Sequence, residues 1–147
     1  MPVRIEIADV DLREEGPRLL VWIHVPSKMQ EAGAPRDNPR QTLALIDTAC
    51  HTTIIKPEIA ELLELKSCGV MRFKAHTGDI VEAPSYCVDI EFRGSDGHGQ
   101  FIAKNVHVGG VRLPENDTGC LLGRDVLQYG VFGYDGVVSA FTLAFEE

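Results

Sequence analysis

An apolar run that ends abruptly on a carboxylate limits what this chain can fold into. Residues 43–46 are Leu-Ala-Leu-Ile, Asp47 follows directly, and the chain returns to an apolar pair at Ile54 and Ile55. Such a run is typical of a buried strand. Because an unpaired charge in a dry environment is costly in free energy, Asp47 needs either a function or a local partner. The structural alternative is that Asp47 caps the following turn through backbone N–H groups.

A second distinctive block lies downstream. Residues 119–123 are Gly-Cys-Leu-Leu-Gly, followed by the charged pair Arg124-Asp125 and a short apolar segment. Between the two blocks, residues 70–83 alternate apolar and polar side chains on either side of a Thr-Gly-Asp turn. That pattern predicts a β-hairpin.

Together the two blocks resemble the retropepsin-like aspartic proteases. Members of that family carry an apolar strand into Asp-Thr/Ser-Gly, then a flap hairpin, then an apolar-apolar-Gly-Arg-Asp/Asn segment. The matching segments here are Asp47-Thr48-Ala49 and residues 121–125, and the resemblance spans residues 41–145. It implies a single-lobed member of the family: a mostly β, closed β-barrel-like acid-protease lobe with one or two short helices.

Short apolar or alternating segments separated by turns independently predict a mostly β, barrel-like fold. We expect one domain over residues 1–147. One helix is expected at residues 56–65, where Pro57 suits the first helical position, and one or two helical turns at residues 124–129. Strands are expected at residues 3–7, 18–25, 41–46, 70–83 (as a hairpin), 86–92, 101–108, 131–134 and 137–145, with a turn at 12–17 and a loop at 26–40.

The composition excludes several classes of function. A chain of 147 residues can bury a core without disulfides or metals. The net charge of −8 and the absence of Lys/Arg clusters argue against nucleic-acid binding. The longest apolar run, residues 19–25, contains His24 and is too short to span a bilayer. No signal peptide is visible, so we expect a cytoplasmic protein that binds neither nucleic acid nor membranes.

The cysteines are scattered, with no Cys-x-x-Cys pair, at Cys50, Cys68, Cys87 and Cys120. Without a secretion signal they are expected to be free thiols. His51 and His76 are further potential ligands, but the spacing of these side chains fits no structural zinc site. We expect no metal and no cofactor.

One Asp-Thr-small motif, Asp47-Thr48-Ala49, follows an apolar strand; the Asp-Thr-Gly at residues 117–119 follows the polar residues Glu115 and Asn116 instead. Peptide hydrolysis without a metal or a covalent nucleophile needs a base that activates water and an acid that protonates the carbonyl oxygen or leaving amine. Two neighbouring carboxylates that share one proton supply both, as in aspartic proteases. Two copies related by a twofold axis would bring Asp47 and its symmetry mate together. The sequence therefore predicts a homodimeric aspartic endopeptidase acting on peptides or proteins.

The resemblance implies supporting roles for residues around Asp47. Thr48 would hydrogen-bond across the dimer, Gly123 would allow close packing against the catalytic loop, and Arg124 would brace that loop. In viral members the partner of this Arg is an acidic residue just beyond the triplet. Because this chain has Cys50-His51-Thr52 there, the brace needs another partner or is lost. Ala49 replaces the usual Gly and adds a methyl group where substrate approaches.

The hairpin at residues 70–83 matches the position of the family's flap, which closes over substrate. Without the resemblance it would be interpreted as an ordinary core hairpin. Substrate would lie extended and pair its backbone with the flap. Separately, Asp125 would cap the short helix expected at residues 124–129. The expected flap tip comprises Ala75, His76, Thr77, Gly78 and Asp79. The expected apolar pocket residues are Ile54, Ile80, Val81 and Leu113.

Two other interpretations stay open. A retropepsin-like domain with weak or lost catalysis would serve as a peptide-binding or dimerisation module, and Ala49 with the missing acidic partner of Arg124 favours that view. The second alternative is an unrelated β-barrel binding module in which Asp47 only caps a turn. Cleavage of peptides, and its dependence on Asp47, would separate the three.

Overall fold

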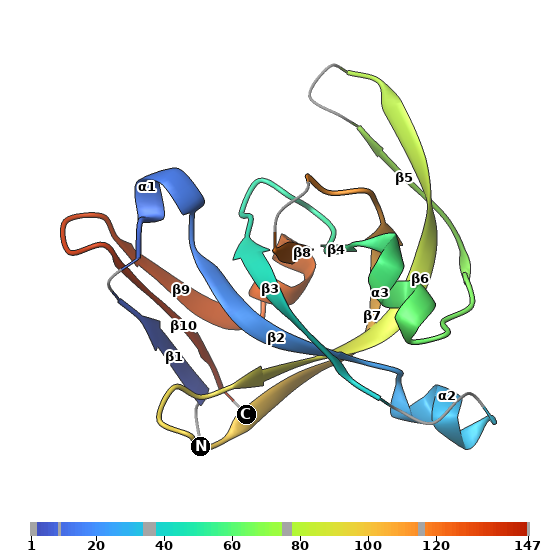
Figure 1. Cartoon of the computed structure of the whole chain (residues 1–147), viewed down its shortest axis with the longest axis horizontal. Coiled ribbons are helices and arrows are strands. Elements are labelled where there is room, and N and C mark those ends of the chain that lie inside the picture. Colours follow the sequence, from blue (N-terminus) through green and yellow to red (C-terminus); the bar gives the residue numbers. More distant parts are fainter. Residues whose placement is uncertain (1–2, 9, 34–37, 75–77, 115–116, 147) are drawn as a thin grey trace.

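A closed barrel of six strands forms the centre of the molecule (Figure 1). The computed structural model describes residues 3–8, 10–33, 38–74, 78–114 and 117–146. The barrel order is β2-β3-β8-β4-β7-β6, closed by pairing of β2 with β6. The strands are β2 Arg18–His24, β3 Arg40–Ile46, β4 Ile54–Ile55, β6 Ile80–Arg93, β7 Gln100–Gly110 and β8 Thr118–Leu122. The mostly β, barrel-like fold expected from the sequence is confirmed.

The barrel order brings the two distinctive sequence blocks side by side. β3 and β8 pair in parallel, with Ile46 opposite Leu122, and the amide of Asp47 donates to the carbonyl of Leu122 at 3.0 Å. Asp47 and Gly123 therefore leave adjacent strands at the same end. β4, which follows the Asp47 loop, pairs antiparallel with β8 and parallel with β7. The loop between β3 and β4 is thus anchored at both ends to the strand that precedes Gly123.

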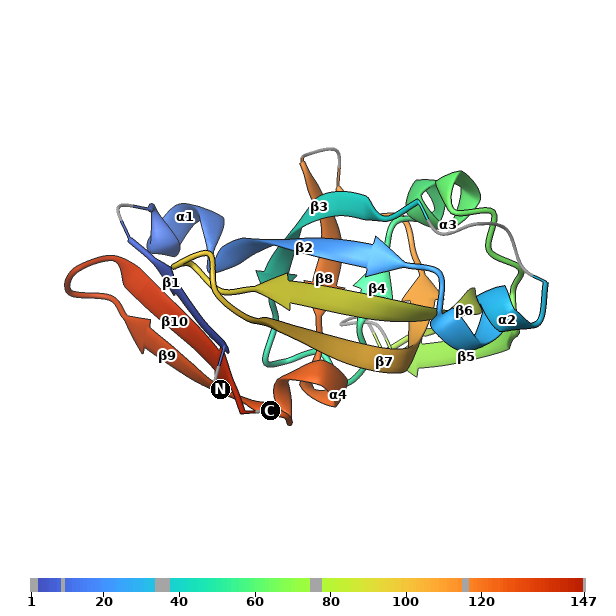
Figure 2. The same cartoon turned by 90° about the horizontal axis from the view of Figure 1, so that it is seen from below.

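A smaller sheet of β1 (Val3–Ile7), β10 (Ala140–Phe145) and β9 (Gly130–Asp135) lies beside the barrel (Figures 1 and 2). β10 is its central strand, so β9 is an outer edge. Phe141, Leu143 and Phe145 alternate inward, as a strand with one buried face requires, and they belong to the same core cluster as the barrel interior. The ring of Phe145 stacks on Phe101 of β7, with centroids 4.2 Å apart.

The predicted hairpin is present and extends away from the barrel (Figure 1). β5 (Gly69–Lys74) pairs antiparallel with the first half of β6, from Lys74 opposite Ile80 to Gly69 opposite Ser85. Met71 and Phe73 are half-buried, whereas the other residues of β5 are exposed. The prediction of a separate strand at residues 86–92 is wrong, because β6 continues through Pro84 as one 14-residue strand. The second half of β6 pairs with β7 and belongs to the barrel.

Four short helices accompany the strands: α1 Leu12–Glu15, α2 Ser27–Glu31, α3 Pro57–Leu62 and α4 Arg124–Leu127. α3 and α4 were expected, although α3 is shorter than the predicted 56–65 because Glu64 has a positive φ of 54°. α1 occupies the predicted turn at 12–17, where the carboxylate of Asp11 accepts from the amide of Glu14. α2 occupies part of the predicted loop at 26–40. None of the described helices has the length and apolar character that a bilayer crossing requires.

The buried carboxylate of Glu91 connects β6 with β2 on the outer face of the barrel. Glu91 of β6 is 5% exposed and accepts from His24 Nε2 at 2.8 Å and from Arg93 Nε at 2.9 Å. The Arg93 guanidinium lies 3.7 Å from the ring centroid of Trp22. Burial alone would raise the pKa of Glu91, but the hydrogen bonds and charges of Arg93 and His24 outweigh burial and hold that pKa below its usual value.

Replacing Glu91 with Gln should destabilise the protein at pH 7 by about 1–3 kcal/mol, the usual cost of removing a buried charged hydrogen-bond partner. Because the folded-state pKa is lowered, the charge stabilises the fold above the unfolded pKa, and this contribution disappears as pH falls through the folded pKa. Urea unfolding at pH 7 and pH 3 should therefore show a difference between wild type and variant that shrinks in acid. Glu82→Gln, which breaks an exposed pair with Arg72, is the control. An equal difference at both pH values would contradict the prediction.

Candidate functional site

Asp47 is the first residue of the loop that joins β3 to β4, and its side chain is half-buried. One carboxylate oxygen, Oδ1, accepts from the amide of Ala49 at 3.1 Å. The carbonyl of Asp47 accepts from the amide of Cys50 at 3.1 Å, which closes a tight turn. The other oxygen, Oδ2, accepts no hydrogen bond from the described part of the chain. Turn capping thus engages half of the carboxylate and leaves the other half available.

Thr53 connects the Asp47 loop to the Gly123 block. It is fully buried, and its hydroxyl donates to Asp125 Oδ1 at 2.6 Å while accepting from the Gly123 amide at 3.0 Å. The Thr53 amide also donates to the Asp125 carboxylate, at 3.0 Å to Oδ2. These contacts fix the loop relative to the second block, so the backbone on which Asp47 sits is rigidly supported.

Gly123 packs directly against this loop. A Cβ atom at this position would lie 2.7 Å from the carbonyl carbon of Thr52, 2.9 Å from the amide nitrogen of Thr53 and 3.0 Å from the carbonyl oxygen of Cys50. Real Cβ atoms do not approach backbone so closely. The glycine is required for space, not for its backbone conformation, because its φ of −89° suits any residue.

Thr48 and Ala49 are both exposed on the loop. The hydroxyl of Thr48 has no hydrogen-bond partner within the described chain, and its contact across a dimer stays a prediction. The described non-glycine residues with positive φ are Glu64, Asn105 and Ser139. Ala49 is not one of them, so the backbone there does not need the freedom of the usual glycine.

Arg124 is exposed, and no carboxylate among the described residues lies within ion-pair distance of it. Its amide donates to the carbonyl of Cys50 at 2.9 Å, so its backbone contributes to holding the loop. Asp125 is not the N-cap of α4, which is Gly123 without a side-chain cap, but its carboxylate accepts from the amide of Val126 in the first turn of that helix. The carboxylate of Asp125 also holds Thr53, which fixes the loop from the other side.

The thiol of Cys50 is unsuited to nucleophilic attack. Its Sγ donates to the carbonyl of Thr52 at 2.8 Å. Burial raises the pKa of this thiol, and the neighbouring charges of Asp47 and Asp125 raise it further. The thiolate, not the thiol, is the reactive form, so the raised pKa disfavours nucleophilic chemistry at Cys50.

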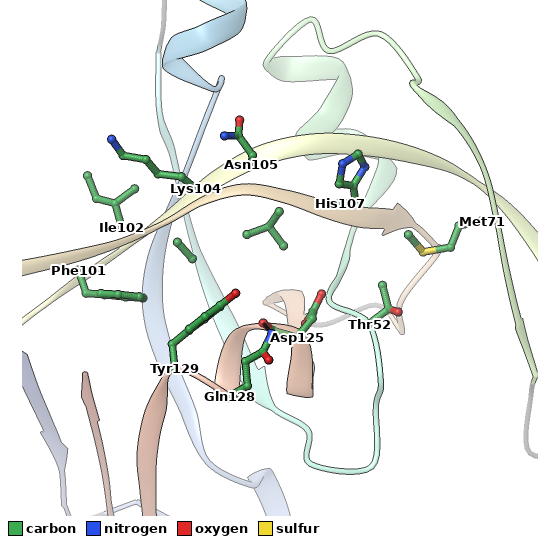
Figure 3. Close-up of a pocket in the computed structure, with 12 residues that line it drawn as sticks. Thr52, Met71, Phe101, Ile102, Lys104, Asn105, His107, Asp125, Gln128 and Tyr129 are labelled. Atoms are coloured by element: carbon green, nitrogen blue, oxygen red, sulfur yellow. Dashed lines mark hydrogen bonds between the residues drawn. The ribbon is translucent and has the colours of Figure 1, made fainter. Parts of the chain in front are cut away.

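A hollow of about 510 Å³ opens beside Asp47. Leu113, foreseen as a pocket residue, is part of its apolar wall with Leu45, Pro114 and Leu121. Its rim carries Glu14, Glu15, Arg18 and Asp117. A second hollow of about 550 Å³ is lined by Thr52 of the same loop and by Asp125 (Figure 3). The loop of residues 47–53 thus contributes to the lining of two cavities, both large enough for side chains of a bound chain.

The expected flap tip is described only in part. Ala75, His76 and Thr77 lie outside the described residues, whereas Gly78 and Asp79 are exposed. Gly78 has a φ of +88°, which favours glycine. The other pocket residues expected from position, Ile54, Ile80 and Val81, line neither hollow.

The four cysteines are free thiols. Within the described ranges, no three His, Cys, Asp or Glu side chains are grouped so as to hold a metal ion. The residue that the sequence analysis missed is Thr53. No local signal identifies it, because its role depends on partners 70 and 72 residues away.

No family model matches this chain, and no curated protein matches it. Among solved structures it is similar to a retropepsin-like aspartic protease from Rickettsia conorii, with a TM-score of 0.55 and 16% sequence identity. The alignment covers 99% of this chain and 93% of that chain. At this identity the likeness concerns the fold, and it supports the fold of a retropepsin-like lobe for this chain.

Proposed function

We propose that this chain is a homodimeric aspartic endopeptidase, in which Asp47 from each of two copies forms one active site. The observation that carries the proposal is the half-engaged Asp47 carboxylate. It stands at a hollow, on a loop that Thr53, Gly123 and Asp125 hold in place. The retropepsin-like fold supports the proposal, because an aspartic protease of known structure has the same fold.

The chemistry requires two carboxylates that share one proton. The ionised Asp47 accepts a proton from water, and the resulting hydroxide oxygen bonds to the peptide carbonyl carbon. The protonated Asp47 of the second copy gives its proton to the carbonyl oxygen. When the C–N bond breaks, the first Asp47 gives its proton to the leaving amine, the second Asp47 takes a proton from a hydroxyl of the tetrahedral intermediate, and the carboxylate pair again holds a single proton.

Substrate would bind in an extended conformation between the β5–β6 hairpin and the Asp47 loop, by strand addition. An apolar side chain next to the scissile bond fits the hollow beside Asp47, because Leu45, Leu113 and Leu121 line it. We propose that the hairpin, with Gly78 and Asp79 near its tip, acts as the flap over the bound peptide.

We place the second copy against the outer edge of the small sheet. β9 is an edge strand, and its Val131 is 73% exposed, with Tyr134 at 52%. An apolar edge strand has unpaired backbone groups that favour pairing with another chain. A second copy would cover this edge and complete the carboxylate pair.

Val131→Lys should convert the protein from dimer to monomer and abolish peptide cleavage with it, because a charge in the dimer interface would be desolvated. Sedimentation velocity over a range of protein concentrations measures the change. Leu62→Lys, on the exposed side of α3, is the matched control and should leave the dimer intact. A wild-type protein that is monomeric at high concentration would contradict the proposed dimer. If Val131→Lys still forms a dimer, the interface does not lie at β9.

Incubation with a diverse peptide mixture between mildly acidic and neutral pH tests the proposed activity. Mass spectrometry of the products should show new termini inside the peptides, and the rate per chain should rise with protein concentration as dimers form. Peptides that bind without being cut would support a peptide-binding module instead. Peptides that neither bind nor are cut would contradict the proposal altogether.

A further inference from the structure

The hollow beside Asp125 is lined by different side chains from those that line the hollow beside Asp47. It lies between β7 and α4 and reaches Thr52 of the loop and Met71 of the hairpin (Figure 3). Its apolar wall includes Phe101, Ala103 and Val106 of β7. Such a wall suits the aliphatic or planar part of a side chain that belongs to a peptide bound along the Asp47 loop.

Two side chains of this hollow, Asp125 and Gln128, offer hydrogen-bond acceptors. Asp125 Oδ1 accepts from the amide of Thr53, the hydroxyl of Thr53 and the amide of Val126. Within the described ranges its Oδ2 accepts only from the Thr53 amide, which it shares with Oδ1. The Gln128 side chain donates its amide N–H to the carbonyl of Asp125 at 2.8 Å, so its Oε1 is an unused acceptor. Asp125 Oδ2 and Gln128 Oε1 thus have capacity for a donor.

The carboxylate of Asp125 has no cation beside it in the described part of the chain. Among the described residues no Lys or Arg lies within ion-pair distance of its carboxylate. Lys104 and His107 are residues of β7 that border the hollow, but their side chains point to the other side of the strand (Figure 3). Thr53 and Val126 stabilise the carboxylate through hydrogen bonds, and its negative charge remains open to pairing with a cationic group of a ligand.

We propose that this hollow binds an arginine or lysine side chain of the peptide held in the cleft, a few residues from the scissile bond. The inference rests on the proposed function, since it takes the occupant to be a peptide lying along the Asp47 loop. A basic side chain combines an apolar stem with a head that only donates hydrogen bonds. Arginine fits best, because its planar guanidinium also stacks on aromatic rings, and Phe101 and Tyr129 line the hollow.

The position of the hollow agrees with this role. Thr52 lies in the same loop as Asp47, and Met71 belongs to the hairpin that would cover the peptide. An extended chain advances about 3.3 Å per residue and alternates its side chains between two faces. One position of the peptide, and not its neighbours, should therefore reach Asp125.

Peptide binding to the full-length Asp47→Asn protein tests the proposal without relying on cleavage. The probes are fluorescent alanine-leucine nonapeptides in which one arginine is moved through every position, each paired with a peptide carrying citrulline, its uncharged isostere. Arginine at one position should bind about tenfold more tightly than citrulline there, since a charge-assisted bond replaces a neutral one. Equal binding of both sets at every position, or no binding of any probe, would overturn the proposal.

Three variants of the Asp47→Asn protein locate the effect. Adding Asp125→Asn keeps an oxygen that accepts from Thr53 but removes the charge. It should bring the ratio of the affinities for the arginine and citrulline peptides close to one. Gln128→Lys changes an exposed residue, places a cation in the hollow and should reverse the ratio. Glu61→Gln, which removes an exposed carboxylate from α3, should leave it unchanged. A ratio that persists in both Asp125→Asn and Gln128→Lys would assign the preference to another site.

The binding and cleavage results distinguish the two proposals. Arginine preference at one position with no cleavage by the wild-type protein would support the basic subsite and reject the endopeptidase. Cleavage without any arginine preference would support the endopeptidase and overturn the subsite.

Discussion

Replacing Asp47 with Asn should lower the rate of peptide hydrolysis by at least about a thousandfold, within the range that general acid–base groups contribute. The amide cannot take a proton from water, yet its oxygen can still accept the hydrogen bond from the Ala49 amide. The turn should therefore survive, and the dimer with it. Circular dichroism and sedimentation establish that fold and assembly are retained, and the peptide-cleavage assay measures the loss.

Mixing the two proteins tests whether the active site is shared. With an excess of Asp47→Asn chains, most wild-type chains form mixed dimers that carry one proposed catalytic carboxylate. Cleavage should then fall with the square of the wild-type fraction. Asp96→Asn, which removes an exposed carboxylate in the loop between β6 and β7, should cause no loss in the same mixture. A linear fall would indicate that each chain acts alone, and undiminished cleavage by pure Asp47→Asn would point to a contaminant or another site.

Gly123→Ala should have the second large effect, because the added methyl group collides with the backbone at distances of 2.7 and 2.9 Å. Overpacking of this kind typically costs about 1–3 kcal/mol of stability. The atoms it meets belong to Thr52 and Thr53, so relief of the collision must move the loop that carries Asp47. We therefore expect peptide cleavage to be lost even where the variant remains folded, since a displacement of about 1 Å in a catalytic group costs about a hundredfold in rate.

Urea unfolding measures the change in stability of Gly123→Ala, and the peptide assay measures activity under conditions in which the variant is folded. Gly136→Ala is the matched control. A Cβ atom there meets only a side-chain atom of Tyr134, at 3.4 Å, so both stability and cleavage should be nearly unchanged. Full activity of folded Gly123→Ala would refute the role of this close packing in holding Asp47.

The strands were largely predictable because their sequence patterns are local. β1 lies at the predicted residues 3–7, and β2 and β3 differ from prediction by one residue at one end. The two helices that were missed, α1 and α2, have four and five residues. Segments this short show no helical periodicity, and α1 depends on the Asp11 cap instead.

The site was predictable only where a motif marks it. Asp47 and the Gly123 block were identified from their residues, and the parallel pairing of β3 and β8 brings them together. The contact between Thr53 and Asp125 was not predictable, because it depends on the register of strands far apart in the sequence. For the same reason Thr53 could not be identified from the sequence: its neighbours are similar residues, and burial alone distinguishes it.

The pairing of β3 with β8 also determines when the Asp47 loop can assemble during protein synthesis. The strand ahead of Asp47 is translated early, but its neighbour comprises residues 118–122. Contacts between such distant segments form late and slow the search for the native state. A nascent chain on the ribosome therefore holds an unassembled Asp47 loop until most of the polypeptide has emerged, and the proposed active site would stay inactive at the exit tunnel.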